Sequence, residues 1–313
     1  MSENLNSQSS ILTGAKQTMA SWSRVIESYE DIPAVYRGFF ETPSADNRHF
    51  PYILLAPVIF KPQGKTTEKL ICDTGDAMQI LEWNGSQVIT KSYPYHSICM
   101  VEVGNILLSS WLTISGVAST GEISTTTIDF STTSVRHYAT FLNKLRPAPQ
   151  GMDEAELNAE KSKFDYLSEI SFKLMNFGRS SLVNGEIVIH SLMQSEIREP
   201  LWKPLGNLFQ RMLSPTHLTI LTNEELILIH ERDQDLPGPH YGGVWQYIPL
   251  RSITSVTLSE PLDDRITLSI TLSSAETIKQ LFDASSQPKL ERIRAQVQDL
   301  IGQVRASDPA MKV

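Results

Sequence analysis

Cysteine is scarce in this chain, whose 313 residues include only Cys72 and Cys99. Two thiols are too few for the disulfide framework that stabilises small secreted domains. No apolar run approaches the roughly 20 residues of a membrane helix, and the polar start MSENLNSQSS lacks the basic and apolar parts of a signal peptide. We therefore expect a cytoplasmic protein with two free thiols.

Positive charge is also in short supply. Lys and Arg number 27 against 35 Asp and Glu, which gives a net charge of −8. A protein that binds duplex nucleic acid usually has a basic balance or a dense basic patch, whereas the basic residues of this chain are scattered. Nucleic acid is therefore not an expected partner.

The residue spacings that mark metal and phosphate sites are missing as well. The seven histidines and two cysteines form no Cys-x-x-Cys or His-x-x-x-His pattern. His96 and Cys99 lie three residues apart in a strand-like run, so their side chains should point to opposite faces. The glycine-rich stretch 238–243 lacks the Gly-x-Gly-x-x-Gly spacing that cradles phosphate. We expect no metal, no cofactor and no catalytic residue.

One triplet stands against this expectation. Asp73-Thr74-Gly75, within KLICDTGDAMQIL, has the local appearance of an aspartic protease active site. Such an enzyme needs two carboxylates that face one water molecule, and a single triplet supplies both only in a homodimer. A hydrolase that acts through Asp73 is therefore the alternative to a plain turn between two strands. In a plain turn, Met78 and Ile80 should face the core.

Short strand-like segments dominate what is present. Apolar, β-branched runs recur between turn residues, and Asn84-Gly85 is a strong hairpin signal. The runs lie at 50–60, 70–72, 77–83, 88–93, 98–103, 106–117 and 124–130, and again at 185–193, 217–222, 225–230, 245–250, 253–258 and 266–272. Helical spacing follows each group, over 135–146 and from Pro288 onward. Residues 152–177 predict one connecting helix, and Trp22 to Tyr36 a short one.

The two groups of strands align with each other. TGDAMQIL (74–81) matches TNEELILI (222–229) at an offset of 148, and YPYHSICMV (93–101) matches IPLRSITSV (248–256) at an offset of 155. The second copy therefore carries seven extra residues, which fall within 231–247. Leu221 occupies the position of Asp73 in this alignment. A repeat of this size predicts tandem domains, with the triplet as one of two equivalent turns.

The second copy also carries a known pattern. LTILTNEELILI (218–229), followed by IPLRSITSV (248–256), resembles bacterial pleckstrin-homology-like (PH-like) domains, and the first copy is similar through Tyr93-Pro94 and Ile98 to Val101. The resemblance implies a mainly β (α+β) fold of two PH-like split β-barrels, each closed by a C-terminal helix and joined by a linker helix. The expected parts are a partly disordered N-terminal segment (1–49), PH-like domain 1 (50–147), a linker helix (148–180), PH-like domain 2 (181–304) and a tail (305–313).

The resemblance also implies a binding function. PH-like domains bind phosphoinositides, peptides or proteins, and the lipid-binding kind has a dense Lys and Arg cluster between its first two strands. Here 61–69 holds three lysines, while 194–217 mixes three basic residues with two glutamates. We therefore expect a non-catalytic scaffold for a protein or peptide partner. The alternative is a membrane surface with anionic lipid, and self-association remains open.

The candidate contact residues lie in the second copy. Tryptophan, tyrosine and arginine are enriched at binding hot spots. The candidates are Tyr241, Trp245, Trp202, Arg198, Lys203 and Arg211. In the alternative interpretation, Trp245 covers its own domain and the segment around Trp202 forms a short helix over the mouth of the barrel.

Overall fold

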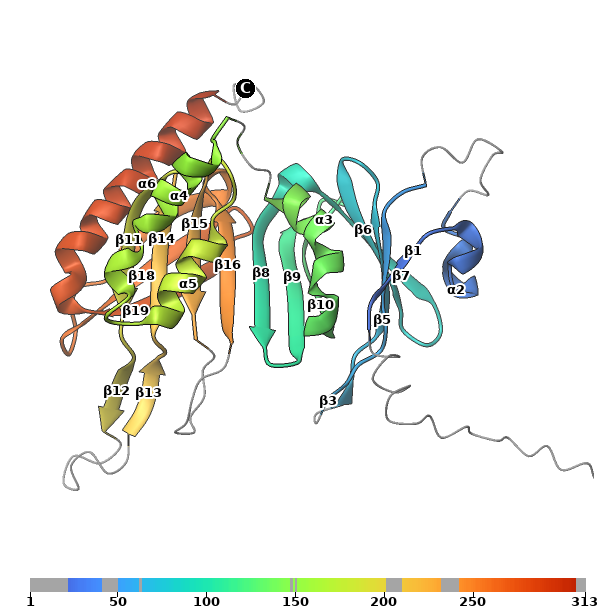
Figure 1. Ribbon diagram of the computed structural model, residues 1–313, viewed down its shortest axis with the longest axis horizontal. Coiled ribbons are helices and arrows are strands. Elements are labelled where there is room, and N and C mark those ends of the chain that lie inside the picture. The colour runs from blue at the N-terminus through green and yellow to red at the C-terminus, as the bar shows by residue number, and fades with distance from the viewer. Residues whose placement is uncertain are drawn as a thin grey trace, which may run out of the picture.

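The computed structural model describes residues 22–40, 50–61, 64–146, 149, 151–200, 210–231 and 242–307. The fold is mainly β, with several open sheets and a long C-terminal helix (Figure 1). Every strand pair in these ranges is antiparallel. Among the described helices, none combines the length and the apolar character needed to cross a membrane.

The first sheet has five strands in the order β1-β2-β5-β6-β7. Its strands are β1 (Arg24–Ile26), β2 (Ile53–Ala56), β5 (Glu68–Asp73), β6 (Ala77–Trp83) and β7 (Val88–Pro94). A small hairpin, β3 (Phe60–Lys61) with β4 (Gly64–Lys65), lies between β2 and β5 in the chain.

The second sheet has seven strands in the order β10-β9-β8-β16-β15-β14-β11. Its strands are β8 (Ile98–Ile106), β9 (Ser109–Val117), β10 (Ile123–Ser131), β11 (Val188–Gln194), β14 (His217–Thr222), β15 (Glu225–His230) and β16 (Gly243–Pro249). Strands β8 and β16 come from different copies and pair with Val103 opposite Trp245. One sheet therefore runs through both copies, as the adjacent strands in the middle of Figure 1 show.

Two smaller sheets and the helices complete the fold. Strands β12 (Ile197–Pro200) and β13 (Gln210–Ser214) form a hairpin, and β17 (Ile253–Leu258), β18 (Arg265–Leu272) and β19 (Thr277–Asp283) form a three-stranded sheet. The helices are α2 (Ala34–Arg37), α3 (Val135–Leu145), α4 (Glu154–Ser162), α5 (Phe172–Ser181) and α6 (Gln287–Ser307). The 3-10 turns are η1 (Tyr29–Asp31), η2 (Tyr95–Ser97), η3 (Thr132–Ser134), η4 (Asp165–Leu167), η6 (Leu250–Ser252) and η7 (Ala284–Ser286).

The same succession of elements occurs twice. Strands β2, β5, β6 and β7 lead through η2 to β8, β9 and β10, and then through η3 to α3. Strands β11, β14, β15 and β16 lead through η6 to β17, β18 and β19, and then through η7 to α6. Each copy also carries a hairpin between its first two strands, β3–β4 or β12–β13. The order of elements therefore follows the alignment of the two copies.

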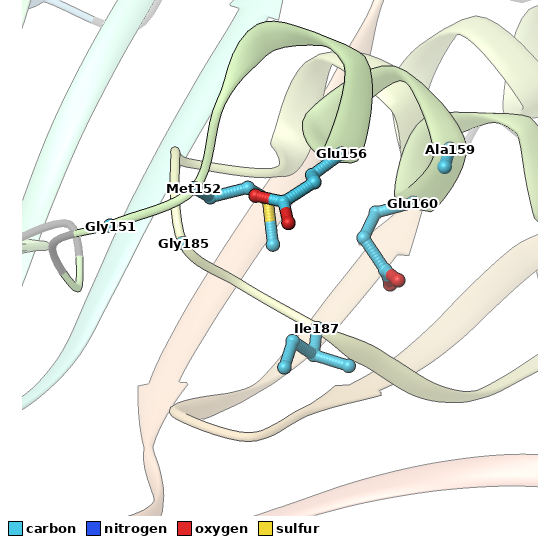
Figure 2. A pocket seen from close by; sticks show the side chains of 7 residues that line it. All are labelled: Gly151, Met152, Glu156, Ala159, Glu160, Gly185 and Ile187. Carbon is cyan, nitrogen blue, oxygen red and sulfur yellow. The ribbon is translucent and has the colours of Figure 1, made fainter.

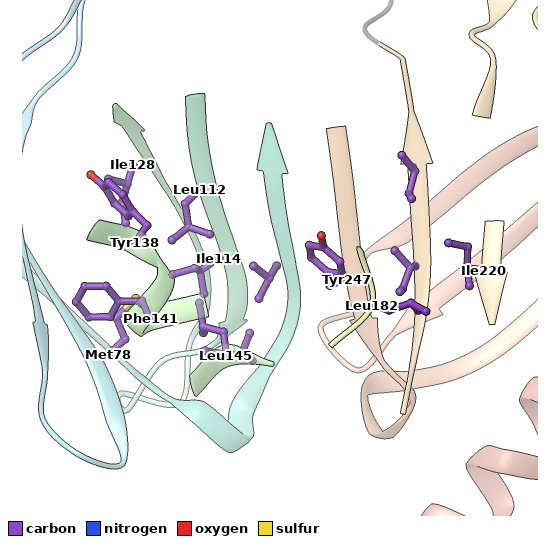
Figure 3. Packing of buried hydrophobic residues seen from close by; sticks show 14 of the residues in the cluster. Met78, Leu112, Ile114, Ile128, Tyr138, Phe141, Leu145, Leu182, Ile220 and Tyr247 are labelled. Atoms are coloured by element: carbon purple, nitrogen blue, oxygen red, sulfur yellow. The ribbon is translucent and has the colours of Figure 1, made fainter. Parts of the chain in front are cut away.

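A continuous apolar cluster joins the copies. It links the inner face of the first sheet, helix α3, helix α5 and one face of the seven-stranded sheet. Met78 and Ile80 are fully buried in it, which confirms the prediction for both. Figure 3 shows Tyr138, Phe141 and Leu145 of α3 beside Ile114 and Ile128, with Leu182, Ile220 and Tyr247 across from them. The opposite face of the second copy's strands packs on the three-stranded sheet and α6 in a separate cluster.

Two helix predictions are wrong in part. Arg24–Ile26 forms a strand paired with β2, and only Ala34–Arg37 of the expected N-terminal helix is α-helical. Burial of Ile26 against β2 outweighs the weak local helix propensity of this stretch. The connecting segment 152–177 is not one helix, because α4 ends at Ser162 and α5 starts at Phe172. The intervening bend lets Phe164 and Leu167 enter the core.

Candidate functional site

Asp73 ends β5 and holds the turn that follows. Its Oδ1 accepts hydrogen bonds from the Gly75 backbone N–H at 3.0 Å and the Tyr95 hydroxyl at 3.1 Å. Its Oδ2 lies 2.6 Å from Lys144 Nζ on α3. Partial burial alone would raise the pKa of Asp73, but these three donors outweigh it and the pKa lies below its usual range. Both carboxylate oxygens are thus occupied by contacts that fix the turn.

The equivalent turn in the second copy is held by the matching threonine. The Thr222 hydroxyl accepts from the Glu225 backbone N–H at 3.0 Å and donates to the Glu225 carbonyl at 3.2 Å. In the first copy, the Thr74 hydroxyl donates to the Ala77 carbonyl at 3.0 Å. Leu221, at the position of Asp73, is fully buried. Each of the two turns is therefore held by a threonine at the same position, whereas only the first turn has an aspartate before it.

Arg146 follows α3 and forms an ionic junction between the copies. Its side chain is only 9% exposed, and its Nε donates to Glu225 at 2.9 Å. Nη2 donates both to Glu225 and to the carbonyl of Ser181 at 2.8 Å, and the guanidinium lies 3.5 Å from the centre of the Tyr247 ring. Arg146 thereby ties the end of the first copy to the β14–β15 turn and to α5.

Glu186 is the second carboxyl at this junction. It is 1% exposed, lies 3.5 Å from Arg146 Nη2, and accepts from the Val183 backbone N–H at 2.8 Å. Burial, and then the nearby charge of Glu225, raise the pKa of Glu186 to about 8. The junction therefore holds two carboxyl groups around one buried cation, and the raised pKa favours the protonated form of Glu186.

A hollow of about 440 Å³ lies beside helix α4 (Figure 2). Figure 2 shows Glu156 and Glu160 projecting from α4 above Ile187. Glu156 accepts from the Asp153 backbone N–H at 2.9 Å in a capping box, and Glu160 accepts from the Val188 N–H at 2.6 Å. These carboxylates hold α4 to its own N-terminus and to β11.

A second pocket, of about 230 Å³, lies at one end of the second copy. There His217 at the start of β14 is opposite His230 at the end of β15, which is opposite Val244 in β16. We call this the pocket end. Two connecting segments start at the pocket end. One joins β11 to β14 and includes the β12–β13 hairpin, and the other joins β15 to β16. The pocket is lined by Ser214, Pro215, His217, His230, Gln246, Ile278, Lys279 and Gln280.

His217 is the most deeply buried of the residues that line this pocket. It is 2% exposed, and its Nδ1 lies 3.0 Å from the Pro215 carbonyl oxygen. A carbonyl only accepts, so Nδ1 carries a proton and Nε2 of the neutral ring presents a bare lone pair. Burial lowers the pKa of His217 to about 4, which keeps the ring neutral at physiological pH. Within the described ranges, its buried Nε2 has no hydrogen-bond partner.

Neighbouring side chains orient the rest of the pocket. Nδ1 of His230 lies 2.9 Å from the Glu231 carbonyl, so its Nδ1 also carries a proton. Gln246 Nε2 donates to Glu102 at 2.9 Å, and Glu102 in turn accepts from the Trp111 indole at 2.8 Å. These two hydrogen bonds connect β16, β8 and β9, so residues of the first copy help to position Gln246, a pocket residue of the second copy.

The sequence candidates surround this end only in part. Arg198 on β12 donates to Glu196 at 2.9 and 3.0 Å, and Arg211 on β13 is exposed. Trp245 is half-buried, with its ring centre 4.6 Å from that of Phe177 on α5, in the segment that connects the two copies. Trp202, Lys203 and Tyr241 lie outside the described residues.

Sequence reasoning missed the histidine pair. The spacing of the seven histidines along the sequence does not indicate that His217 and His230 pair, although the strands 217–222 and 225–230 flank a two-residue turn. Antiparallel pairing across such a turn places residue 217 opposite residue 230. The register of one predicted hairpin was therefore the signal that could have found them.

The two cysteines are buried and free, in separate apolar clusters. Burial raises the pKa of the Cys72 thiol to about 12. His96 lies in the turn η2, whereas Cys99 lies in β8, so the expectation that both residues belong to one strand-like run is wrong. Among the described residues, no group of three or more His, Cys, Asp or Glu could hold a metal ion.

No family model matches the chain, and no curated protein matches its sequence. The pocket end is the candidate binding site of this chain.

Proposed function

We propose that this chain is a non-catalytic tandem PH-like scaffold that binds a protein or peptide partner at the pocket end. In this proposal each copy is a split barrel with four strands on one side, three on the other and a C-terminal helix. The repeated order of elements supports it. So does the apolar cluster that fills the second copy between β14–β16, the three-stranded sheet and α6.

The pocket of about 230 Å³ between β14, β15, β16 and β19 carries the proposal. Two connections leave the sheet around this pocket. Binding residues are often carried by connecting segments that a rigid scaffold positions.

Rigid support favours binding at this end. The β8–β16 pairing, the Gln246–Glu102 hydrogen bond and the Arg146 junction all tie the second copy to the first. A recognition surface held in place loses less conformational entropy when it binds. In this proposal the first copy holds the binding surface of the second copy in a fixed position.

The β12–β13 hairpin offers a second contact for a partner. Its strands pair only with each other among the described strands, and it extends beyond the body of the second copy in Figure 1. An open strand edge can accept a further strand from a peptide. Arg211 is exposed on this hairpin, close in sequence to the pocket residue Ser214.

Site-specific photo-crosslinking in the native host tests the proposal. A photoreactive amino acid replaces Arg211 in one variant and the exposed Glu291 of α6 in the control. We expect one partner protein to be captured from position 211 and not from position 291. Equal capture at both positions, or none from position 211, would refute binding at the pocket end.

The same experiment separates the alternatives. Capture of a second copy of this chain from position 211 would indicate self-association. Sedimentation with phosphatidylserine vesicles tests the membrane alternative, which predicts pelleting that weakens with salt and with Arg211→Glu. Such pelleting, without capture of a protein, would replace the scaffold proposal by lipid binding.

A further inference from the structure

We infer that the outer edge of β11 takes one further strand, an extended segment of the protein partner that pairs antiparallel with residues 191–193. This inference rests on the proposed function, because it names the backbone form in which the partner binds next to the pocket end. It is carried by the repeat, since the equivalent edge of the first copy already holds a strand.

The register of the two sheets makes β2 the first-copy counterpart of β11. Leu54 of β2 lies opposite Ile71 in β5. Leu192 of β11 lies opposite Thr219 in β14. Ile71 and Thr219 are 148 residues apart, which is the offset of the alignment between the copies. Leu54 and Leu192 are both buried, each in the apolar core of its own copy. Leu192 is therefore the counterpart of Leu54.

In the first copy, the outer edge of β2 is occupied by β1. This strand pairs antiparallel with residues 53–55, and Val25 lies opposite Leu54. Val25 packs against the apolar cluster of the first copy, and Ile26 is only 1% exposed. Side chains as well as backbone hydrogen bonds therefore hold the added strand. The fold of one copy thus accepts a strand at this edge.

In the second copy, β11 is the last strand of its sheet. Among the described residues, only those of β14 form backbone hydrogen bonds with 191–193. Helix α4 holds the start of the edge, where the Val188 N–H donates to Glu160 and Lys163 donates to the Val188 carbonyl. These contacts end at Val188. The rest of the edge therefore keeps backbone groups with which a further strand can pair.

The surroundings of this edge define the side chains of the added strand. By the register of the first copy, one residue lies opposite Leu192 as Val25 lies opposite Leu54. A β-branched apolar residue suits this position, because it borders the apolar core. The adjacent residue lies opposite Ser191, whose hydroxyl is 2.9 Å from that of Tyr166. Tyr166 is 49% exposed, so an apolar residue there gains contact with its ring. The expected occupant is an extended segment with two adjacent apolar residues.

The position of the edge favours the partner at the pocket end as the source of this strand. Gln194, the last residue of β11, lies opposite the pocket residue His217. A segment that reaches the pocket can therefore continue along β11. A second copy of this chain is a poorer source, because Ile26 holds its β1 in a buried cluster.

Nuclear magnetic resonance of the full chain tests the added strand with two peptides. The first, Trp-Ser-Arg-Val-Ile-Glu-Ser, copies residues 22–28 and contains the β1 sequence. The second is the same peptide with N-methyl groups on valine and isoleucine, which removes two adjacent N–H donors. We expect the first peptide to shift the amide resonances of 191–193 and the second to bind about tenfold more weakly, as the loss of one hydrogen bond implies. No shift at 191–193, a shift confined to 53–55, or equal affinities would overturn the inference.

Two variants provide matched controls for the position of the strand. Tyr166→Ala removes the ring beside Ser191, and Phe172→Ala removes an exposed ring on α5. The first should weaken binding of the unmodified peptide about two- to fivefold, which is the contribution of one cross-strand pair, and the second should leave it unchanged. Equal affinities of the two variants would overturn the placement of the strand beside Ser191.

The peptide and the photo-crosslinking experiment together separate this inference from the proposed function. Capture of a partner from position 211 without a peptide shift at 191–193 would refute the inference and leave the proposed function standing. A shift at 191–193 without capture from position 211 would retain the strand site and refute binding of a partner at the pocket end.

Discussion

Replacement of Arg146 by methionine tests the junction between the copies. The substitution retains an apolar stem but removes the cation that faces Glu225 and Glu186, which are 6% and 1% exposed. Removal of one partner from a buried ion pair costs about 3–5 kcal/mol, because the other charge stays buried and unpaired. This is a large share of the roughly 5–15 kcal/mol by which proteins are stable. We therefore expect a marked loss of free energy of unfolding.

The loss should also depend on pH. The pKa of Glu186 is about 8 in the folded chain, compared with 4.5 for a glutamate in the unfolded chain. A raised pKa contributes stability that is full below pH 4.5 and is lost as the pH rises through 8. Arg146 lowers this pKa, so its removal raises the pKa of Glu186 further and increases the cost of ionising it. The variant should therefore lose more stability at pH 9 than at pH 6.

Urea unfolding followed by circular dichroism at both pH values measures the effect. Arg179→Met is the matched control, since Arg179 pairs with Asp165 at the surface and exposed pairs contribute about 0–1 kcal/mol. If Arg146→Met costs no more than this control at either pH, the buried junction does not contribute as argued.

Two further perturbations test local features. A Cβ at Gly104 would lie 2.1 Å from the Trp111 ring, so Gly104→Ala should cost about 1–3 kcal/mol in urea unfolding, whereas Gly302→Ala, in open space within α6, should gain about 0.5–1 kcal/mol. Equal effects would contradict the close packing of the Trp111 ring. Asp73→Asn should lower the free energy of unfolding at pH 7 by no more than about 1 kcal/mol. Because the pKa of Asp73 is depressed, its contribution is present above the unfolded pKa, and the difference should vanish as the pH falls through the folded value. A loss that persists at pH 2 would indicate that charge is not the cause.

Local sequence patterns predicted much of the fold. Strand-length apolar runs and the alignment of 74–81 with 222–229 predicted the repeated order of strands and a helix after each set. These signals depend on neighbours in the chain, such as the threonine that closes each turn. The prediction for Met78 and Ile80 was correct for the same reason, since side chains alternate along a strand.

Long-range contacts explain what the sequence did not reveal. Nothing local indicates that Val103 pairs with Trp245, because the two residues belong to different copies and their pairing depends on how the copies pack. The strand at Arg24–Ile26 likewise exists only because β2 lies beside it. The pocket is formed by residues of β14, β15 and β19 together. Its prediction requires both the register of β14 against β15 and the position of β19, and local sequence patterns do not give the position of β19.

The pairing of β8 with β16 has a consequence for how this chain could be divided. Separation of the copies between 147 and 150 would leave each fragment with an unpaired strand edge that matches the other. The fragments should therefore reassemble when they are expressed together, as the two parts of a split reporter do.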